Sequence, residues 1–554
     1  MQPTTAVNVT ERPTDWNAVN WQQANRSVRN LRQRTFRAAQ AGDLKKVSSL
    51  QKLMLRSYSN TLLSVRRVTQ VNAGKHTPGV DHLTVKTPKA RGALVDALRR
   101  DQLWRVHPTR RVYIPKANGK QRPLGIPTIR DRCRQARVKN ALEPYWEAHF
   151  EATSYGFRPG RSCHDAISRI AKTVNGRSHL SWVLDGDIKG AFDNIAHDAL
   201  QKTIGAFPGR ELIKQWLKAG YIEQERFFQT DTGTPQGGVI SPLLANIALH
   251  GMEQALNITY NAKDVRQGQR VVVRYADDFV VLCASQEDAQ AAQNTLQGWL
   301  TTRGLSFSTE KTRIVSMWEG FDFLGFTLKW VRTSTRERGH KLHIRPSRAS
   351  LGKLRRRLRQ EWLDLRGSNI DVALWKLNPI VRGWANYFRY SSASKAFSKL
   401  DSWMFIRAMR HVKREHSDKA WRWLYERYWG RLNPKRQDHW VFGNTKTGHH
   451  LLKFSWSTLQ AHVLVKGTAS PDNPVLRDYW QHRQRTHAQT LIPSQQKLAR
   501  HQAYRCPVCN ESLFNNEPLE VHHQQARAAG GSNRYDNLIL VHLYCHQQLT
   551  AQQR

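Results

Sequence analysis

Two adjacent carboxylates lie inside the apolar stretch VVVRYADDFVVLC, which runs from Val271 to Cys283. The runs on either side of Asp277 and Asp278 are rich in β-branched and aromatic residues, which favour strands. Two such runs joined by a short polar step predict a β-hairpin with both carboxylates at its turn. Adjacent like charges need a positive partner there, although a solvated hairpin tip also fits this stretch alone.

Further β-rich runs alternate with short helical patterns between residues 76 and 330. They are RRVYIP, WVLDGDI, RFFQT and TRIVSMW. This mixture predicts an α+β domain with an antiparallel sheet. Residues 16–72 instead show helical spacing of apolar positions, and Gly74 and Pro78 end that pattern, so residues 1–75 are predicted to form a helical N-terminal extension.

The charge balance restricts the partners of the chain. Its 554 residues include 87 Lys and Arg against 43 Asp and Glu, a formal net charge of +44. Such an excess opposes compaction unless a polyanion neutralises it, which favours nucleic acid. An anionic membrane surface is the runner-up, but no apolar window is long enough to span a bilayer. Without a secretory signal, a cytoplasmic, nucleoid-associated protein is expected, and an organellar location stays open.

Arginine and tryptophan are concentrated between residues 331 and 440. The segment LGKLRRRLRQEWLDL places its apolar residues on one helical face, while Arg355, Arg356 and Arg359 project from the others. Such a charge run is usually only a solvated face, but arginine without matching acid, among aromatic residues, favours contact with RNA or DNA. Residues 441–500 are polar and predict a linker or a DNA-binding region.

A second acidic segment, VLDGDIKGAFDNI, follows a β-rich run. Asp187 at a strand end and Asp277 on a neighbouring hairpin can hold two divalent ions roughly 3.5–4 Å apart, an arrangement suited to in-line displacement at phosphorus. Mg²⁺ needs few protein ligands there, because substrate phosphates complete its shell. For Asp187 alone, a strand-end cap is the alternative.

Seven blocks follow one another in an order and spacing that resemble the reverse transcriptases encoded by group II introns. They are YIPKANGKQRPLGIPTIRDRCRQ, YGFRPGRSCHDAI, DIKGAFDNI, GTPQGGVISPLLANIAL, YADD, GLSFSTEKT and FDFLGF. The resemblance implies that Asp187, Asp277 and Asp278 are the catalytic carboxylates, the first two binding Mg²⁺. It also implies right-hand-like fingers and palm over residues 76–330, with an antiparallel palm sheet.

The same resemblance implies a binding site for the incoming dNTP. Its residues would be Lys116, Arg122, Phe192 and Gln236. The two cations suit a triphosphate, the phenyl ring would reject a 2′-hydroxyl, and Gln236 lies in the block beneath the templating base pair. A solvated basic turn, a core ring and an ordinary tight turn are the alternatives. Lys311 would neutralise phosphate charge, whereas Asp185 and Asp193 match no metal ligand and are expected to be structural.

The segment NPIVRGWANYFRY resembles the thumb, or maturase domain X, of that family. This α-helical domain grips the intron RNA and stabilises its splicing-competent form. RNA contacts are therefore expected at Arg382, with Trp384, Tyr387 and Arg389 as further candidates. Aromatic residues at helical spacing are, however, more often part of a core.

Cysteine and histidine are paired near the C-terminus. Cys506-x₂-Cys509 and His542-x₂-Cys545 have the spacing of a closed structural zinc site. Another metal or bare thiols are the alternatives. Zinc is expected to fold residues 501–554 separately, so that loss of a ligand should spare the polymerase.

The residues around these pairs resemble an HNH endonuclease with a ββα-metal fold. They are Glu520, His522, His523, Asn537 and His546. The match implies His523 as general base, a role suited to its near-neutral pKa. It implies His522 and His546 as ligands of one Mg²⁺ or Mn²⁺, and Asn537 as the residue that orients the base. Thr550 replaces a His that the family usually has, so a DNA-binding knuckle that does not cut remains the alternative.

These features predict an α+β protein with five regions. They are an N-terminal extension (1–75), fingers and palm (76–330), thumb or domain X (331–440), a linker or DNA-binding region (441–500) and a zinc-stapled HNH domain (501–554). The expected function is that of a reverse transcriptase, maturase and endonuclease in intron mobility, with intron RNA, target DNA and dNTPs as partners and a homodimer as an option. An RNA-binding splicing factor without mobility and a defence-system reverse transcriptase are the rivals.

Overall fold

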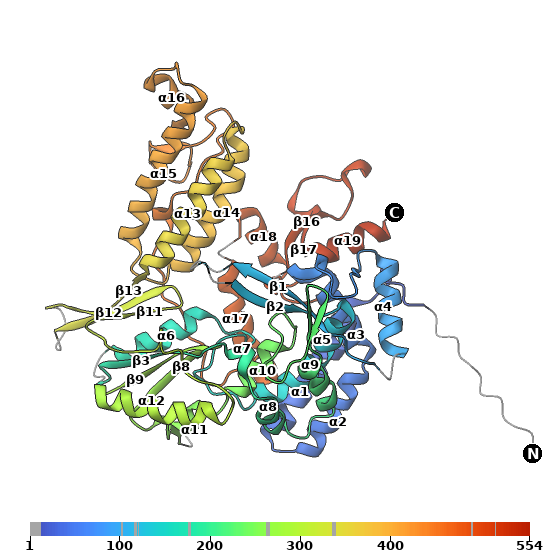
Figure 1. Ribbon diagram of the computed structural model, residues 1–554. Helices are drawn as coiled ribbons and strands as arrows, with labels where there is room; N and C mark the ends of the chain where they lie inside the picture. Colours follow the sequence, from blue (N-terminus) through green and yellow to red (C-terminus); the bar gives the residue numbers. More distant parts are fainter. Residues whose placement is uncertain are drawn as a thin grey trace, which may run out of the picture.

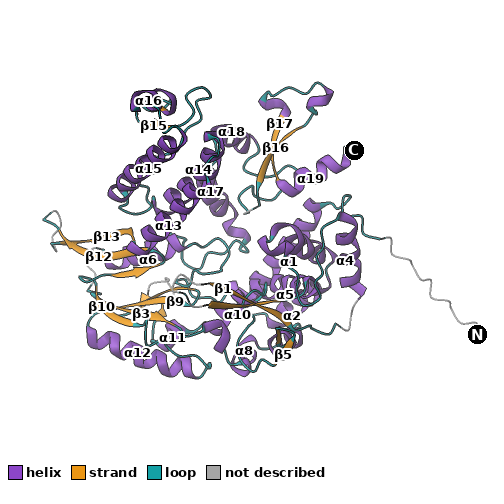
Figure 2. Cartoon of the chain, turned by 45° about the horizontal axis from the view of Figure 1, so that its top comes forward, coloured by secondary structure: helices purple, strands orange, loops and turns teal. Residues whose placement is uncertain are grey.

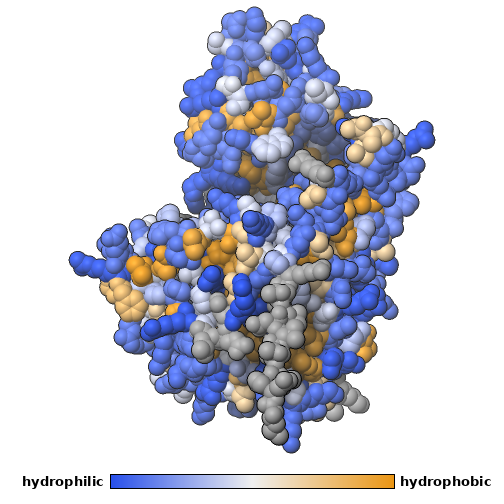
Figure 3. All heavy atoms as spheres, turned by 90° about the vertical axis from the view of Figure 1, so that its right-hand side faces the viewer, coloured by the Kyte–Doolittle hydropathy of each residue, from blue (hydrophilic) through white to orange (hydrophobic). Residues whose placement is uncertain are grey.

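The computed structural model describes residues 13–100, 104–115, 119, 121–175, 179–261, 266–334, 339–488, 491–515 and 517–553. An α+β body carries an upright helical lobe on one side and a small C-terminal module on the other (Figure 1). Hydrophilic side chains cover most of the face shown in Figure 3, with apolar ones scattered among them. Within the described residues, no helix has the length and apolarity needed to cross a bilayer.

Helices form the N-terminal part of the body. They are α1 (Trp21–Gln40), α2 (Leu44–Arg56), α3 (Tyr58–Arg66), a π-helical turn (Arg67–Val71), a 3₁₀ turn (Ala73–His76), α4 (Pro88–Arg100) and α5 (Ile129–Glu147). The side chains of Asn20, Asp43 and Ser57 cap the first three helices by accepting a backbone N–H. Their apolar faces pack around α5.

A four-stranded antiparallel sheet forms the centre of the body. Its order is β10 (Arg313–Ser316), β3 (Trp182–Asp187), β9 (Asp278–Cys283) and β8 (Val271–Tyr275). Successive strand residues point to opposite faces. One set packs with α6 (Cys163–Val174) and the other with α12 (Gln286–Thr301), on the two sides of the sheet (Figure 1). The predicted hairpin and antiparallel sheet are confirmed.

A second sheet and several short helices adjoin it. The sheet has the order β2 (Gln121–Ile126), β1 (Thr109–Pro115), β4 (Tyr221–Glu223) and β5 (Arg226–Phe228). The helices are α7 (Ala191–Asn194), α8 (His197–Ile204), α9 (Arg210–Lys218), α10 (Ser241–Ala248) and α11 (Met252–Ala255), and β6 (Thr259–Tyr260) pairs with β7 (Arg266–Gln267).

A three-stranded sheet leads into the helical lobe. It comprises β11 (Phe321–Phe323), β12 (Phe326–Arg332) and β13 (His340–Pro346). The lobe contains α13 (Arg348–Asp364), α14 (Ile370–Phe388), α15 (Ser394–Glu415), α16 (Trp421–Tyr428), β14 (Trp429–Gly430) and β15 (Val441–Phe442). One continuous core joins these helices to β12 and α6.

Residues 441–500, for which the sequence predicts a linker or DNA-binding region, contain short elements packed against other regions. They include 3₁₀ turns Phe454–Trp456 and Pro474–Leu476 and helices α17 (Arg477–His487) and α18 (Pro493–His501). Buried Asp165 accepts from the backbone of Val465 at 2.9 Å and pairs with His462. Asp472 pairs with Arg32 at 2.7 Å.

The C-terminal module consists of β16 (Leu519–His523), β17 (Leu538–His542) and α19 (Leu543–Gln552). Figures 1 and 2 both show it beside the N-terminal helices. Trp21, Val65 and Val68 share one core with residues of the module such as Leu540 and Cys545. The apolar faces of the module and of the N-terminal helices therefore bury each other. That residues 501–554 fold separately stays a prediction.

Candidate functional site

Strands β3 and β9 bring the two acidic segments together. Asp187, the last residue of β3, lies directly opposite Asp278, the first residue of β9. Asp277 precedes it in a two-residue turn, since Tyr275 pairs with Asp278. The hairpin pattern predicted both carboxylates at the turn, but Asp278 is the first residue of the strand and only Asp277 lies in the turn. All three carboxylates lie at one end of the sheet.

The carboxylates repel one another. Partial burial, together with Asp277 and Asp187, raises the pKa of Asp278 to about 6, although its side chain keeps an exposed surface. The Lys311 ammonium lies 2.9 and 3.1 Å from the two oxygens of Asp187. This hydrogen bond raises the pKa of Lys311. Asp185 pairs instead with Arg313 at 3.3 Å, and burial raises its pKa.

The predicted nucleotide-site residues are partly joined to one another. Arg122 Nε donates to Gln236 Oε1 at 3.0 Å, and Gln236 Nε2 reaches Asp193 Oδ2 at 3.5 Å. Phe192 is 8% exposed and lies edge-on to Phe157, with ring centroids 6.3 Å apart. Lys116 lies outside the described residues. The side chains of Arg122 and Gln236 are thus held together from different segments of the chain.

Arg274, which sequence reasoning missed, hydrogen-bonds to the hairpin turn from the protein interior. It is 1% exposed, and its Nη1 donates to the Ala276 carbonyl at 3.2 Å and to Asn246 Oδ1 at 2.9 Å. Asn246 Nδ2 in turn donates to the Gly156 carbonyl at 2.8 Å. A Cβ on Gly156 would lie 2.3 Å from the Ala276 nitrogen, so only glycine allows this approach. The sequence feature that could have indicated this role is an arginine within an otherwise apolar strand.

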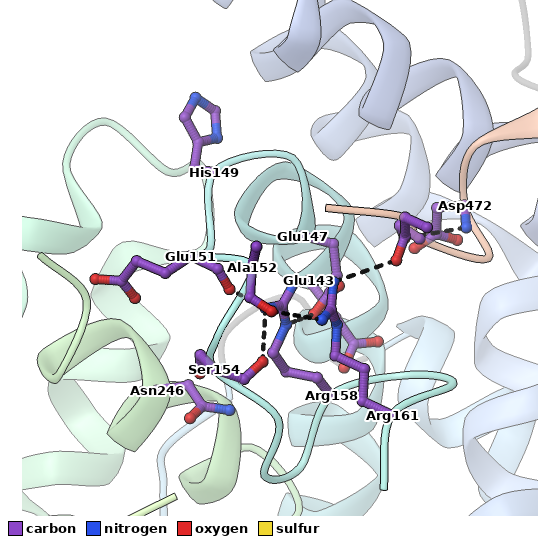
Figure 4. A network of polar contacts seen from close by, with 12 residues as sticks. Glu143, Glu147, His149, Glu151, Ala152, Ser154, Arg158, Arg161, Asn246 and Asp472 are labelled. Carbon is purple, nitrogen blue, oxygen red and sulfur yellow. Dashed lines mark hydrogen bonds and ion pairs between the residues drawn. The ribbon is translucent and has the colours of Figure 1, made fainter. Parts of the chain in front are cut away.

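A buried network holds the loop that carries Gly156. In Figure 4, Arg158 lies between the carboxylate of Glu147 and the carbonyls of Glu151 and Ser154. Its Nε and Nη2 each donate to Glu147 at 3.0 Å, and its Nη1 donates to the two carbonyls at 2.7 and 2.9 Å. Every guanidinium nitrogen therefore has an acceptor, as a buried charge requires.

The predicted RNA-binding residues differ in exposure. Arg355, Arg356 and Arg359 are exposed on α13, and Arg382 is exposed on α14. Two of the further candidates point inward, because their rings complete the lobe core. They are Trp384, which contacts Phe388, and Tyr387, whose hydroxyl donates to the Leu324 carbonyl at 2.9 Å.

Four side chains converge in the C-terminal module. Cys506, Cys509, His542 and Cys545 are buried, and their ligand atoms lie within 4.8 Å of one another. His542 Nδ1 faces the thiols, 3.3 Å from Cys509 Sγ, while Nε2 lies 3.0 Å from the Ser512 carbonyl. This arrangement fixes the ring for metal binding through Nδ1. Three sulfurs and one nitrogen fit a tetrahedral zinc site.

Next to this group lies a second, more open cluster. Glu520 and His522 share one face of β16, and His546 Nδ1 lies 2.5 Å from Glu520 Oε2. The rings of His522 and His546 have centroids 5.0 Å apart. Burial and the neighbouring imidazoles lower the pKa of His522. Carboxylate and imidazole are side-chain types that bind divalent ions, and in this structure Glu520 is paired with His546.

The predicted general base lies on the other face of β16. His523 Nε2 lies 3.0 Å from Asn533 Oδ1. Asn537 stabilises the loop between β16 and β17. Its side chain donates to the Ser532 carbonyl at 2.8 Å and accepts from the Gln525 N–H at 2.8 Å. Thr550 donates to the His546 carbonyl at 3.0 Å, so its hydroxyl proton is used within the helix.

Four family models match successive parts of the chain. They are "Reverse transcriptase (RNA-dependent DNA polymerase)" over residues 114–328, "N-terminal domain of reverse transcriptase" over 16–98, "Group II intron, maturase-specific domain" over 351–429 and "HNH endonuclease" over 506–552. Their order confirms the family that the seven sequence blocks predict.

Similar curated proteins agree with these matches. Protein YkfC of Escherichia coli is 38% identical over 303 residues, which cover 48% of this chain and 80% of YkfC. The group II intron-encoded protein LtrA of Lactococcus lactis is 34% identical over 46% of this chain, and the match spans about half (52%) of LtrA. A 91 kDa protein in the cob intron of Schizosaccharomyces pombe is 26% identical over 58% of this chain and 49% of its own. The chain belongs to the family of group II intron-encoded reverse transcriptases that carry a maturase-specific domain and an HNH endonuclease domain.

Proposed function

We propose that this protein copies intron RNA into DNA, assists splicing of that RNA and cuts a DNA target, so that the intron moves by target-primed reverse transcription. The observation that carries the polymerase role is the register of β3 and β9, in which Asp187 lies directly opposite Asp278 with Asp277 adjoining. Repulsion among three exposed or half-exposed carboxylates at a sheet end, only partly offset by Lys311, favours a site that binds divalent cations.

Asp187 and Asp277 would hold two Mg²⁺ ions, which supply Lewis-acid stabilisation of an in-line displacement at phosphorus. Asp278 assists at the opposing strand position. Arg122 and Lys116 bind the triphosphate, while Phe192 and Gln236 lie against the nucleotide. Lys311, which pairs with Asp187 at 2.9 Å, is free to turn toward phosphate once a metal replaces it.

The matches favour a reverse transcriptase of mobile introns over both rivals, because they include a maturase-specific domain and an HNH endonuclease. We assign fingers and palm to the two central sheets and the thumb to the lobe of α13 to α15. Arg355, Arg356, Arg359 and Arg382 contact intron RNA. Cys506, Cys509, His542 and Cys545 hold a structural Zn²⁺, and His522 and His546 hold a catalytic Mg²⁺ or Mn²⁺.

Primer extension on an RNA template tests the polymerase role. Asp277→Ala should abolish DNA synthesis, since removal of a ligand of a two-metal site costs several kcal/mol, roughly a thousandfold or more in rate. Binding of the intron RNA should be retained. Asp198→Ala, which removes an exposed carboxylate of α8, is the matched control. DNA synthesis by Asp277→Ala at the control rate would refute the assignment.

Salt titration of RNA binding tests the thumb assignment. Charge reversal at Arg355, Arg356 and Arg359 should reduce the slope of log K against log salt by about 0.7–0.9 per lost phosphate contact. The same reversal at the exposed lysines of α2 (Lys45, Lys46 and Lys52) is the control. Equal slopes for both variants would mean that the arginines form only a solvated face.

A further inference from the structure

The metal-binding group of the C-terminal module is in contact with the N-terminal helices. Arg66, at the end of α3, donates from Nη2 to Cys545 Sγ at 3.2 Å and to Glu517 Oε2 at 3.0 Å. Arg66 is 5% exposed, and its guanidinium lies over the ring of Trp21 at 4.7 Å. A cation is therefore fixed beside one of the four ligand atoms from a point 479 residues earlier in the chain.

The charge of the filled site explains why a cation belongs there. Three thiolates, one neutral imidazole and a dipositive ion leave one net negative charge. All four ligand side chains are buried, and a buried charge is costly unless it is paired and hydrogen-bonded. Arginine is suited to such a position because it stays charged and offers several donors in a fixed plane.

Other contacts hold the same interface in register. Asn25 Nδ2 donates to the backbone carbonyl of Cys509 at 3.4 Å. Lys75 Nζ donates to the Tyr544 hydroxyl at 2.7 Å, and that hydroxyl donates to the Gln70 carbonyl. Gln548 Nε2 donates to the Val19 carbonyl at 2.9 Å. The N-terminal region thus positions two residues of the metal-binding group, Cys509 and Cys545, and two further residues of α19, Tyr544 and Gln548.

We propose that Arg66 is an outer-sphere positioning residue of this metal site, so that the N-terminal helical region completes the site and metal binding locks the two regions together. The inference rests on the proposed metal site, and it does not depend on the proposed polymerase or endonuclease activity. Because α19 also carries His546, this lock fixes the position of the second cluster relative to the body of the protein.

The test measures zinc affinity of the full-length protein by competition with a chromophoric chelator. Arg66→Met keeps an apolar stem and removes the donors and the charge. Outer-shell partners of metal ligands typically contribute about 10–100-fold in affinity, and a loss in that range is expected. Arg29→Met is the matched control, since Arg29 pairs with Glu511 of the same module but contacts no ligand sulfur. It should change affinity by less than about threefold on this argument.

Two further measurements make the result independent of a folding defect. In the Co²⁺-substituted protein, Arg66→Met should shift the sulfur-to-cobalt charge-transfer band to lower energy, because a lost hydrogen bond destabilises the sulfur electrons. In the unmodified protein, removal of zinc should increase hydrogen exchange in α3 and in residues 67–76, while β3 and β9 stay protected. Wild-type affinity and spectrum in Arg66→Met, or equal losses in Arg29→Met, would overturn the proposal. A wild-type chain that binds no zinc would instead refute the metal site itself.

Discussion

The carboxylate site at the end of β3 and the Cys/His group of the C-terminal module differ in how their charges are satisfied. Asp187, Asp277 and Asp278 face solvent at least in part and have Lys311, itself 63% exposed, as a movable partner. The Cys/His ligands are buried, and their outer contacts are already made by Ser512 and Arg66. A site that exchanges substrates keeps its charges accessible, whereas a site that supports a fold encloses them.

The largest effect on enzymatic activity should follow from a change at the open site. Asp187→Asn removes one charge with little change of shape, and it should reduce primer extension by roughly a thousandfold or more. Zinc content and the melting temperature should stay at wild-type values. A substantial fall in melting temperature would show that Asp187 supports the fold and that the contrast between the sites is wrong.

A change at the enclosed site should have the opposite signature. Cys509→Ala should abolish stoichiometric zinc, and zinc binding is worth on the order of 10 kcal/mol in small zinc modules. Because the module shares a core with α1 and α3, both regions should lose protection from hydrogen exchange. If α1 and α3 of Cys509→Ala instead kept wild-type protection from hydrogen exchange, the module would fold separately, as the sequence predicts. Cys163→Ala, at a cysteine outside the metal group, is the control.

The pH dependence of polymerisation should reflect partial burial and the electrostatic repulsion among the three carboxylates, which together raise the pKa of Asp278. The pKa of Asp278 is raised to about 6, above the ordinary value near 4, so the ionised form of Asp278, which would assist the two metal-binding carboxylates, is lost as the pH falls through about 6. Lys311 lowers that pKa, and Lys311→Met should move the acid limb of the rate profile to higher pH. Single-turnover rates between pH 5 and 8 at fixed Mg²⁺ would measure this. An unchanged limb would mean that Lys311 does not affect the ionisation of Asp278.

The same repulsion has a smaller consequence for stability. Ionised Asp278 destabilises the metal-free fold above pH 6, and this cost disappears below the unfolded-state pKa. Asp278→Asn should therefore stabilise the metal-free protein at pH 7.5, by no more than about 1 kcal/mol once solvent screening is allowed for. Urea unfolding at pH 7.5 and pH 4 would show the difference at the higher pH only. A gain of equal size at both values would point to a cause other than charge.

A modest effect on DNA cleavage is expected from a change beside the enclosed site. Thr550→His places an imidazole one helical turn after His546, and it should lower the metal concentration needed for DNA nicking by on the order of tenfold. Nicking of a labelled duplex by the ribonucleoprotein across a metal titration measures this. No cutting by either protein, with zinc content and DNA binding intact, would identify the module as a DNA-binding knuckle.

The sequence by itself determined the local elements and the family. Apolar runs rich in β-branched and aromatic residues predicted β8 and β9, and the spacing of Leu354, Leu358 and Trp362 predicted the buried face of α13, as the structure confirms. The order of seven blocks indicated the family that four models match. These features depend on short-range periodicity and on residue identity, and both can be read directly from one amino-acid sequence.

Tertiary structure decided which distant groups meet. Arg274 donates to the Ala276 carbonyl and to the Asn246 side-chain amide oxygen, and although an arginine in an apolar strand is unusual, the sequence does not indicate these partners. Trp384 and Tyr387 turned inward because the lobe core required their rings. The contact between Arg66 and Cys545 spans nearly the whole chain. Such pairs depend on how apolar faces are buried together, and helical or strand periodicity fixes which face is apolar without specifying its partner.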